Sequence, residues 1–97
     1  MTRFWGKKAD ANQPAVIAAL RREGYSVTPI HRVGQGCPDL LVGAMGVNVC
    51  IEVKDGDKSL TDGEVKWHAN WGGQVDIARS PDEAVAVVRT ALWRLKK

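Results

Sequence analysis

The sequence predicts an α/β domain in which helices flank a mixed β-sheet, and three observations favour this fold class. Short apolar runs rich in β-branched residues follow one another through the middle of the chain. Two of these runs are joined by Gly43–Gly46, a connection typical of an antiparallel hairpin. Segments with helical periodicity lie before, between and after the runs. The expected order of elements is therefore α-β-β-β-α-β-α.

The first half of the chain is expected to contribute one helix and three strands. The helix covers Pro14–Glu23 and ends at Gly24, and either Asn12 or Asp10 caps its start. The strands are expected at residues 25–30, 39–42 and 47–54, and a loop with two glycines at residues 31–38.

The third expected strand alternates in character. Its odd-numbered positions from Val47 to Val53 form an apolar face, and its even-numbered positions from Asn48 to Lys54 form a more polar one. Because successive strand side chains point to opposite faces, Glu52 and Lys54 share a face and Val53 lies on the other.

The second half of the chain begins with a turn at Asp55–Lys58. Thr61 and Glu64 have the spacing of a capping box, which predicts a second helix ending near Trp71–Gly73. A fourth strand is expected at residues 74–78.

The last helix has a clear start signal. Ser80 and Glu83 have the capping spacing, and Pro81 occupies the first helical position. The apolar stripe expected along this helix consists of Val85, Val88, Leu92 and Leu95.

Composition indicates a single globular domain over residues 1–97. Hydrophobic residues make up 44% and charged residues 26%, which argues against disorder. The net charge of +3 suits a polyanionic partner without requiring one. The chain shows no secretory signal and no long apolar run, and two cysteines cannot build a disulfide framework, so we expect a reduced cytoplasmic protein that does not associate with membranes. Residues 1–11, which include three basic side chains, are expected to form a flexible basic arm.

The most informative residues are Asp39, Glu52 and Lys54. The hairpin is expected to bring Asp39 beside Glu52, on the strand face that also carries Lys54. Two carboxylates and an amine at one place suit a hard divalent cation and a phosphate group. The simpler alternative is a solvated strand face with a surface salt bridge. Carboxylates are poor strand residues, however, and these two stand in strongly apolar strands.

Gly36-Cys37-Pro38-Asp39 followed by Glu52-Val53-Lys54 resembles the PD-(D/E)xK nuclease superfamily. The segments Gly-x-Pro-Asp-Leu-Leu-Val-Gly and Glu-Val-Lys-Asp-Gly, followed by Leu60-Thr61 and Trp67-His68, look most like its small VRR-NUC-type phage members. The resemblance extends from about Asp10 to Ala78. The restriction-endonuclease-like core of this superfamily has the order α-β-β-β-α-β, which matches the expected order.

The resemblance implies a DNA endonuclease that hydrolyses phosphodiester bonds with Mg²⁺ or Mn²⁺, and structure-specific cleavage of branched or junction DNA is one form of this activity that it suggests. Asp39 and Glu52 would ligate the metal together with the main-chain carbonyl of Val53. Lys54 would orient or help deprotonate the attacking water, or stabilise the oxygens of the phosphorane-like state. These roles of Lys54 stay open.

The helix-borne part of the site has alternatives. The family usually carries an acid on the first helix, and here either Asp10 or the neutral Gln13 would take its place. Many relatives carry a glutamine where this chain has Glu64. Glu64 either reaches the metal or a water bound to it, or serves only the capping box.

Candidate contacts to DNA are His31, Arg32 and Gln35 in the loop and Lys58 in the turn. Trp67 and Trp71 lie four residues apart, so that core packing is the first interpretation and stacking on DNA bases the second. His68 is expected to be a surface or hydrogen-bonded histidine rather than a catalytic base.

A homodimer would allow paired cuts in DNA, with Trp93 or Trp5 at the interface. Two other functions compete with the nuclease. One is a catalytically inactive module that only binds nucleic acid, and the other is a structural protein whose carboxylates form salt bridges.

Overall fold

The computed structural model describes residues 11–95, so Asp10, Trp5 and most of the expected basic arm lie outside the described residues. The elements are α1 (Gln13–Arg22), β1 (Ser26–Pro29), the 3₁₀ helix η1 (His31–Val33), β2 (Leu40–Ala44), β3 (Val47–Val53), α2 (Asp62–Asn70), β4 (Val75–Ala78) and α3 (Pro81–Leu95). The expected order is confirmed, and the bounds differ from the expected ones by only a few residues. The short η1 lies within the segment expected to be a loop.

The four strands form one mixed sheet in the order β1-β2-β3-β4. β2 pairs antiparallel with both β1 and β3, and β3 pairs parallel with β4. The hairpin between β2 and β3 turns at Met45 and Gly46, where φ is 54° and 79°. Positive φ at both central residues matches the right-handed twist of the flanking strands, so this tight turn fixes the register of β2 against β3.

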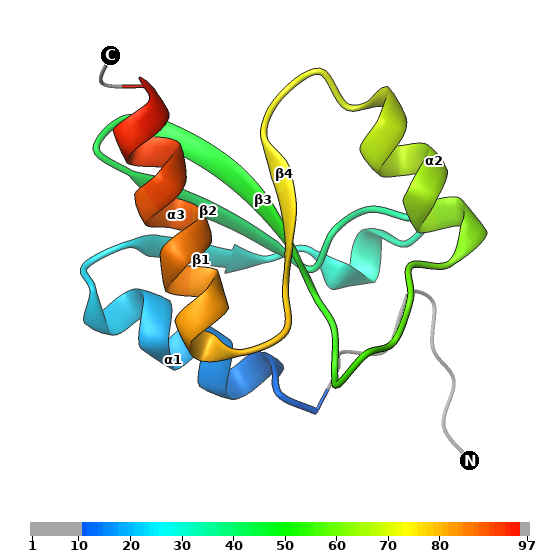
Figure 1. Ribbon diagram of the computed structural model, residues 1–97, viewed down its shortest axis with the longest axis horizontal. Helices are drawn as coiled ribbons and strands as arrows, with labels where there is room; N and C mark the ends of the chain where they lie inside the picture. The colour runs from blue at the N-terminus through cyan, green and yellow to red at the C-terminus, as the bar shows by residue number, and fades with distance from the viewer. Residues whose placement is uncertain (1–10, 96–97) are drawn as a thin grey trace.

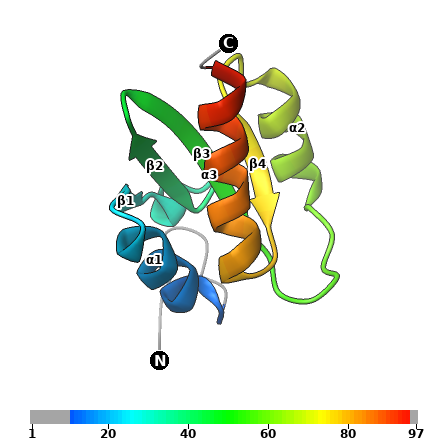
Figure 2. The ribbon, with the colours of Figure 1, turned by 60° about the vertical axis from the view of Figure 1, so that its left-hand side comes forward.

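Two helices cover one face of the sheet. α1 and α3 pack on each other, and α3 also packs on β3 and β4, while α2 lies on the other side (Figure 1). Figure 2 shows α3 running beside β4, with α1 and α2 well separated. The core between helices and sheet includes Val16, Leu20, Leu40, Val42, Ile51, Val53 and Val88.

The stripe expected along α3 is correct except at its end. Val88 is buried and Val85 and Leu92 pack against the core, whereas Leu95 is exposed. The buried residues of α3 end at Ala91, so Leu95 lies one turn beyond the part of the helix that contacts the sheet. Within residues 11–95, no helix is both long and apolar enough to cross a membrane.

The cap expected from Asn12 at the start of α1 is wrong. Asn12 occupies the N-cap position, but its side chain makes no capping hydrogen bond. Its Nδ2 instead donates to the carbonyl oxygens of Lys54 and Arg79, at 3.3 and 3.2 Å. These residues directly follow β3 and β4, so Asn12 fastens the start of α1 to the carboxyl ends of two parallel strands.

The other two helix starts are as expected. Thr61 and Glu64 form the complete capping box of α2. At α3, Ser80 Oγ accepts a hydrogen bond from the main-chain N–H of Glu83 at 3.1 Å. The carboxylate of Glu83 accepts from Arg79 N at 2.7 Å, one residue before Ser80.

Candidate metal and phosphate site

Asp39 stands just before β2, next to the end of β3 that carries Glu52. Its main-chain N–H donates to the carbonyl of Ile51 at 3.2 Å, and its side chain accepts from the N–H of Val53, so Asp39 bonds to the residues on both sides of Glu52. Both Asp39 and Glu52 are buried, with at most 1% of either residue exposed. The alternative of a solvated strand face therefore does not hold.

A short hydrogen bond fixes the orientation of Asp39. Its Oδ2 accepts from the main-chain N–H of Val53 at 2.7 Å. The N–H and the carbonyl of a strand residue point to the same side, so the Val53 carbonyl also faces the side on which Asp39 lies.

Lys54 brings α2 into the cluster. Its Nζ lies 2.8 Å from Glu64 Oε1 and 3.9 Å from Glu52 Oε2, and all three side chains are nearly inaccessible to solvent. Glu64 Oε1 also accepts the Thr61 N–H of the capping box at 2.9 Å. The alternative in which Glu64 serves only the capping box is therefore wrong, because the same carboxylate pairs with Lys54. A contact between Glu64 and a metal stays a prediction.

Gln13 approaches the same region from α1. Its Nε2 lies 3.3 Å from His31 Nδ1, and the residue before His31, Ile30, donates its N–H to the carbonyl of Asp39 at 2.7 Å. Gln13 is buried, and its Oε1 has no hydrogen-bond partner in the described part of the chain. Gln13 therefore contacts His31, and the residue next to His31 is bonded to Asp39. Asp10, the alternative to Gln13, lies outside the described residues.

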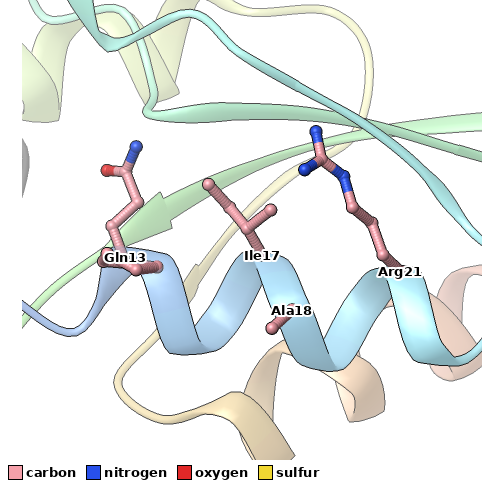
Figure 3. A pocket seen from close by; sticks show the side chains of 5 residues that line it. Gln13, Ile17, Ala18 and Arg21 are labelled. Carbon is pink, nitrogen blue, oxygen red and sulfur yellow. The ribbon is translucent and has the colours of Figure 1, made fainter.

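A pocket of about 360 Å³ runs along α1 beside Gln13. Gln13, Ile17 and Arg21 repeat every four residues, and their side chains point to the same side of the helix, away from Ala18 (Figure 3). Arg21 also donates to the Val27 carbonyl at 3.1 Å, which ties this face of α1 to β1. The Gln13 side chain therefore both lines this pocket and contacts His31.

The donor atoms of the cluster suit a hard divalent cation. Carboxylates, a main-chain carbonyl and an amide oxygen are the ligands that Mg²⁺ accepts, and this ion commonly takes one or two carboxylates and keeps several waters. Within residues 11–95, no three side chains of the His, Cys, Asp and Glu types converge to hold a metal by themselves. A metal bound by Asp39 and Glu52 would therefore need the Val53 carbonyl, the buried Gln13 Oε1 or water to complete its coordination.

The glycine loop packs on the first turn of α2. Gly34, Gln35 and Gly36 all have positive φ, at 73°, 58° and 83°. A Cβ on Gly36 would collide with the carbonyl of Gly63, the residue before Glu64. Glycine is therefore required at position 36 for two reasons, its backbone conformation and its close contact with α2.

The residues expected to contact DNA differ in exposure. Arg32, Gln35 and Lys58 are exposed, and His31 is half-buried against Gln13. Arg79, which the sequence did not single out, holds the loop that carries Lys58. Its Nη1 donates to the carbonyls of Gly56 and Lys58 at 2.9 and 2.8 Å. No local sequence signal could have identified Arg79, because its acceptors lie more than twenty residues away.

The interpretation of Trp67 and Trp71 as core residues is wrong. Their rings stack on each other, with centroids 4.6 Å apart and planes 19° apart, and Trp71 is 48% exposed. Neither residue belongs to the core cluster. The spacing of four residues correctly indicated that the two side chains are neighbours, but Trp71 is the extended residue that follows α2, so the two do not share a helix face.

Cys37 and Cys50 are buried cysteines, each two residues before a carboxylate of the site, Asp39 or Glu52. Burial raises the pKa of the Cys50 thiol, and the neighbouring Cys37 raises it further. Cys50 therefore stays protonated at neutral pH.

The sequence matches no model of a known protein family and no curated protein. The interpretation of the site therefore depends on its geometry and on the chemistry of its side chains.

Proposed function

We propose that the protein is a divalent-metal-dependent phosphodiesterase that cuts DNA internally. The observation that carries this proposal is that Asp39 bonds to Ile51 and Val53, the residues on both sides of Glu52, while the Lys54 ammonium lies 3.9 Å from Glu52 Oε2 in the same buried cluster. Three side chains suited to metal and phosphate thus gather at the ends of two adjacent strands, and α2 adds Glu64. The PD-(D/E)xK resemblance assigns the same three residues to catalysis.

Burial supports a functional role for these charges. Transferring a carboxylate from water into the protein interior costs several kcal/mol, and an ion pair often recovers only part of that cost. A cluster kept only for stability would be replaceable by apolar side chains, as in the rest of this sheet. The carboxylates stand instead beside Leu40 and Ile51, two residues with no exposed surface.

Each residue has a distinct task in this proposal. Asp39, Glu52 and the Val53 carbonyl would hold Mg²⁺ or Mn²⁺, with Gln13 Oε1 as a neutral ligand from α1. When bound, such a cation lowers the pKa of a coordinated water and neutralises charge on the scissile phosphate. Lys54 either orients the attacking water or stabilises the phosphate oxygens in the transition state. Glu64 holds the Lys54 ammonium in place through its 2.8 Å contact.

The direct test is cleavage of linear and branched DNA with Mn²⁺ or Mg²⁺, comparing the wild type with Asp39→Ala and Lys54→Ala. Removing one stabilising group of an active site lowers kcat by about a hundredfold or more, and we expect each variant to lose at least that much. Glu23→Ala is the matched control, because it removes an exposed carboxylate at the end of α1.

Equal cleavage by the wild type and both site variants would show that a contaminant makes the cuts. Binding of DNA without cleavage under any metal would favour the catalytically inactive module. The preference for branched DNA and the homodimer stay predictions. Light scattering that gives a monomer at micromolar concentration would contradict the homodimer.

A further inference from the structure

The stacked indoles of Trp67 in α2 and Trp71 just after it form an aromatic surface. Trp67 is half-buried and supports Trp71, and the two ring planes are 19° apart. Gly73 also lies so close that a Cβ there would come within 2.9 Å of Trp71 Nε1. The Trp71 ring is therefore in contact with Trp67 and close to Gly73 although nearly half of the residue is exposed, and a ring whose movement is restricted in this way loses little freedom when it binds a partner.

A pocket of about 320 Å³ adjoins these rings. Its lining consists of Gln35, Gly63, Lys66, Trp67, Asn70 and Trp71. This volume is at the small end of the range of ligand pockets, about 300 to 1,000 Å³. The lining combines aromatic rings for a flat partner, amides for hydrogen bonding and one ammonium for an anion. These are the groups that recognise a nucleobase and its phosphate.

The pocket lies close along the chain to the candidate catalytic centre. Gly63, which lines it, is followed by Glu64, which pairs with Lys54. Gln35, also in the lining, is followed by Gly36, which packs on Gly63. One residue thus separates the pocket lining from the buried cluster, and we expect one DNA strand to contact both.

Gln35 is held in an unusual conformation. Its φ of 58° lies in the left-handed region, which costs a residue with a Cβ about 1 kcal/mol or more. Strained residues of this kind gather at binding sites, where the surrounding structure holds them. Gln35 lines the pocket and stands between two glycines that also have positive φ.

We propose that Trp71, supported by Trp67, stacks on an unpaired base of the DNA, while Lys66 contacts a neighbouring phosphate. The proposal rests on the proposed nuclease function and names its substrate class: DNA with a single-stranded segment beside the bond that is cut. A base inside a duplex is already stacked on its neighbours and would not reach the ring.

The test is binding of fluorescein-labelled oligothymidylate, measured by anisotropy in EDTA. Trp71→Ala is expected to raise Kd roughly tenfold or more, since base stacking on one aromatic ring contributes that much. An abasic oligomer of the same length is expected to bind the wild type more weakly and to be unaffected by the substitution, because it keeps the phosphates and lacks the bases.

Gly73→Ala tests the same site without removing a tryptophan. Its new Cβ would push the Trp71 ring aside, so oligothymidylate should bind more weakly. Gly72→Ala is the matched control, because a Cβ there meets nothing within 4 Å. This pair keeps the test decisive if Trp71→Ala fails to fold.

Equal wild-type affinity for oligothymidylate and the abasic oligomer would overturn the proposal, and so would unchanged binding in both Trp71→Ala and Gly73→Ala. EDTA prevents metal-dependent cleavage. A protein that stacks bases but never cuts DNA would therefore contradict the proposed function and leave the base site intact.

Discussion

Glu64 joins a helix cap to an ion pair. The same Oε1 accepts the Thr61 N–H at 2.9 Å and lies 2.8 Å from Lys54 Nζ. This arrangement explains why a residue in the first turn of α2 is buried. It also couples the position of α2 to the side chain proposed to act on the phosphate.

We expect Glu64→Ala to lower the free energy of unfolding by about 3 kcal/mol or more, because the buried Lys54 ammonium loses the carboxylate with which it forms its shortest ion pair. Thr61→Ala removes only part of the cap and should cost about 1 kcal/mol. Urea denaturation of both variants measures the two losses. Equal losses would mean that the pair with Lys54 adds nothing beyond the cap.

The Cys50 thiol makes the free energy of unfolding depend on pH in the alkaline range. Burial, followed by the effect of Cys37, raises its pKa above the ordinary value of 9.0. Well below that value both folded and unfolded chains keep the proton, so this group does not change stability with pH. As the pH rises further, the unfolded chain loses the proton first, and stability declines.

Cys50→Ala should therefore lose less stability than the wild type between about pH 8 and pH 10. Chemical denaturation across this range measures the difference between the two proteins, so that the other groups that titrate there cancel. Parallel declines in the two proteins would contradict a raised pKa at Cys50.

The contact between the glycine loop and α2 depends on Gly36. Gly36→Ala would force a Cβ into the Gly63 carbonyl at a position where φ is already +83°. We expect a loss of about 2 kcal/mol or more, because strain and collision add.

Gly63→Ala is the matched variant on the other side of this contact. A Cβ added at this position would meet nothing within 4 Å. Alanine stabilises a helix by about 1 kcal/mol relative to glycine, so the free energy of unfolding should stay equal or rise. Thermal unfolding compares the two variants. A harmless Gly36→Ala would show that the loop and α2 are less closely packed than the structure indicates.

The elements with strong local signals were predictable. Alternation along Val47–Val53 indicated the faces of β3, and the glycines near the turn indicated the hairpin, so the sequence brought Asp39 to the end of β3 that carries Glu52, where it bonds to Val53. The faces of α2 were not predictable, because its short, weakly amphipathic sequence does not show which side meets the sheet. A spacing of four residues is compatible both with packing into the core and with the stacking of Trp67 on Trp71 that the structure shows.

At the scale of the whole molecule, the unpredicted contacts are those between distant parts of the chain. Asn12 bonds to carbonyls 42 and 67 residues away, and this contact decides where α1 begins relative to β3 and β4. Whether Asp10 or Gln13 reaches the candidate metal site depends on where α1 begins, and the local sequence pattern does not contain this information. The strand-borne residues of the site were predictable because a hairpin is local.

We propose that the buried carboxylates form a divalent metal site, and the direct test is calorimetric titration with Mn²⁺. We predict that the wild type binds Mn²⁺ and that Glu52→Gln, which keeps the size of the side chain, binds it at least about tenfold more weakly. Binding should also raise the unfolding temperature of the wild type, since a ligand of the folded state stabilises it. No heat of binding in the wild type, or equal affinity in Glu52→Gln, would contradict the claim.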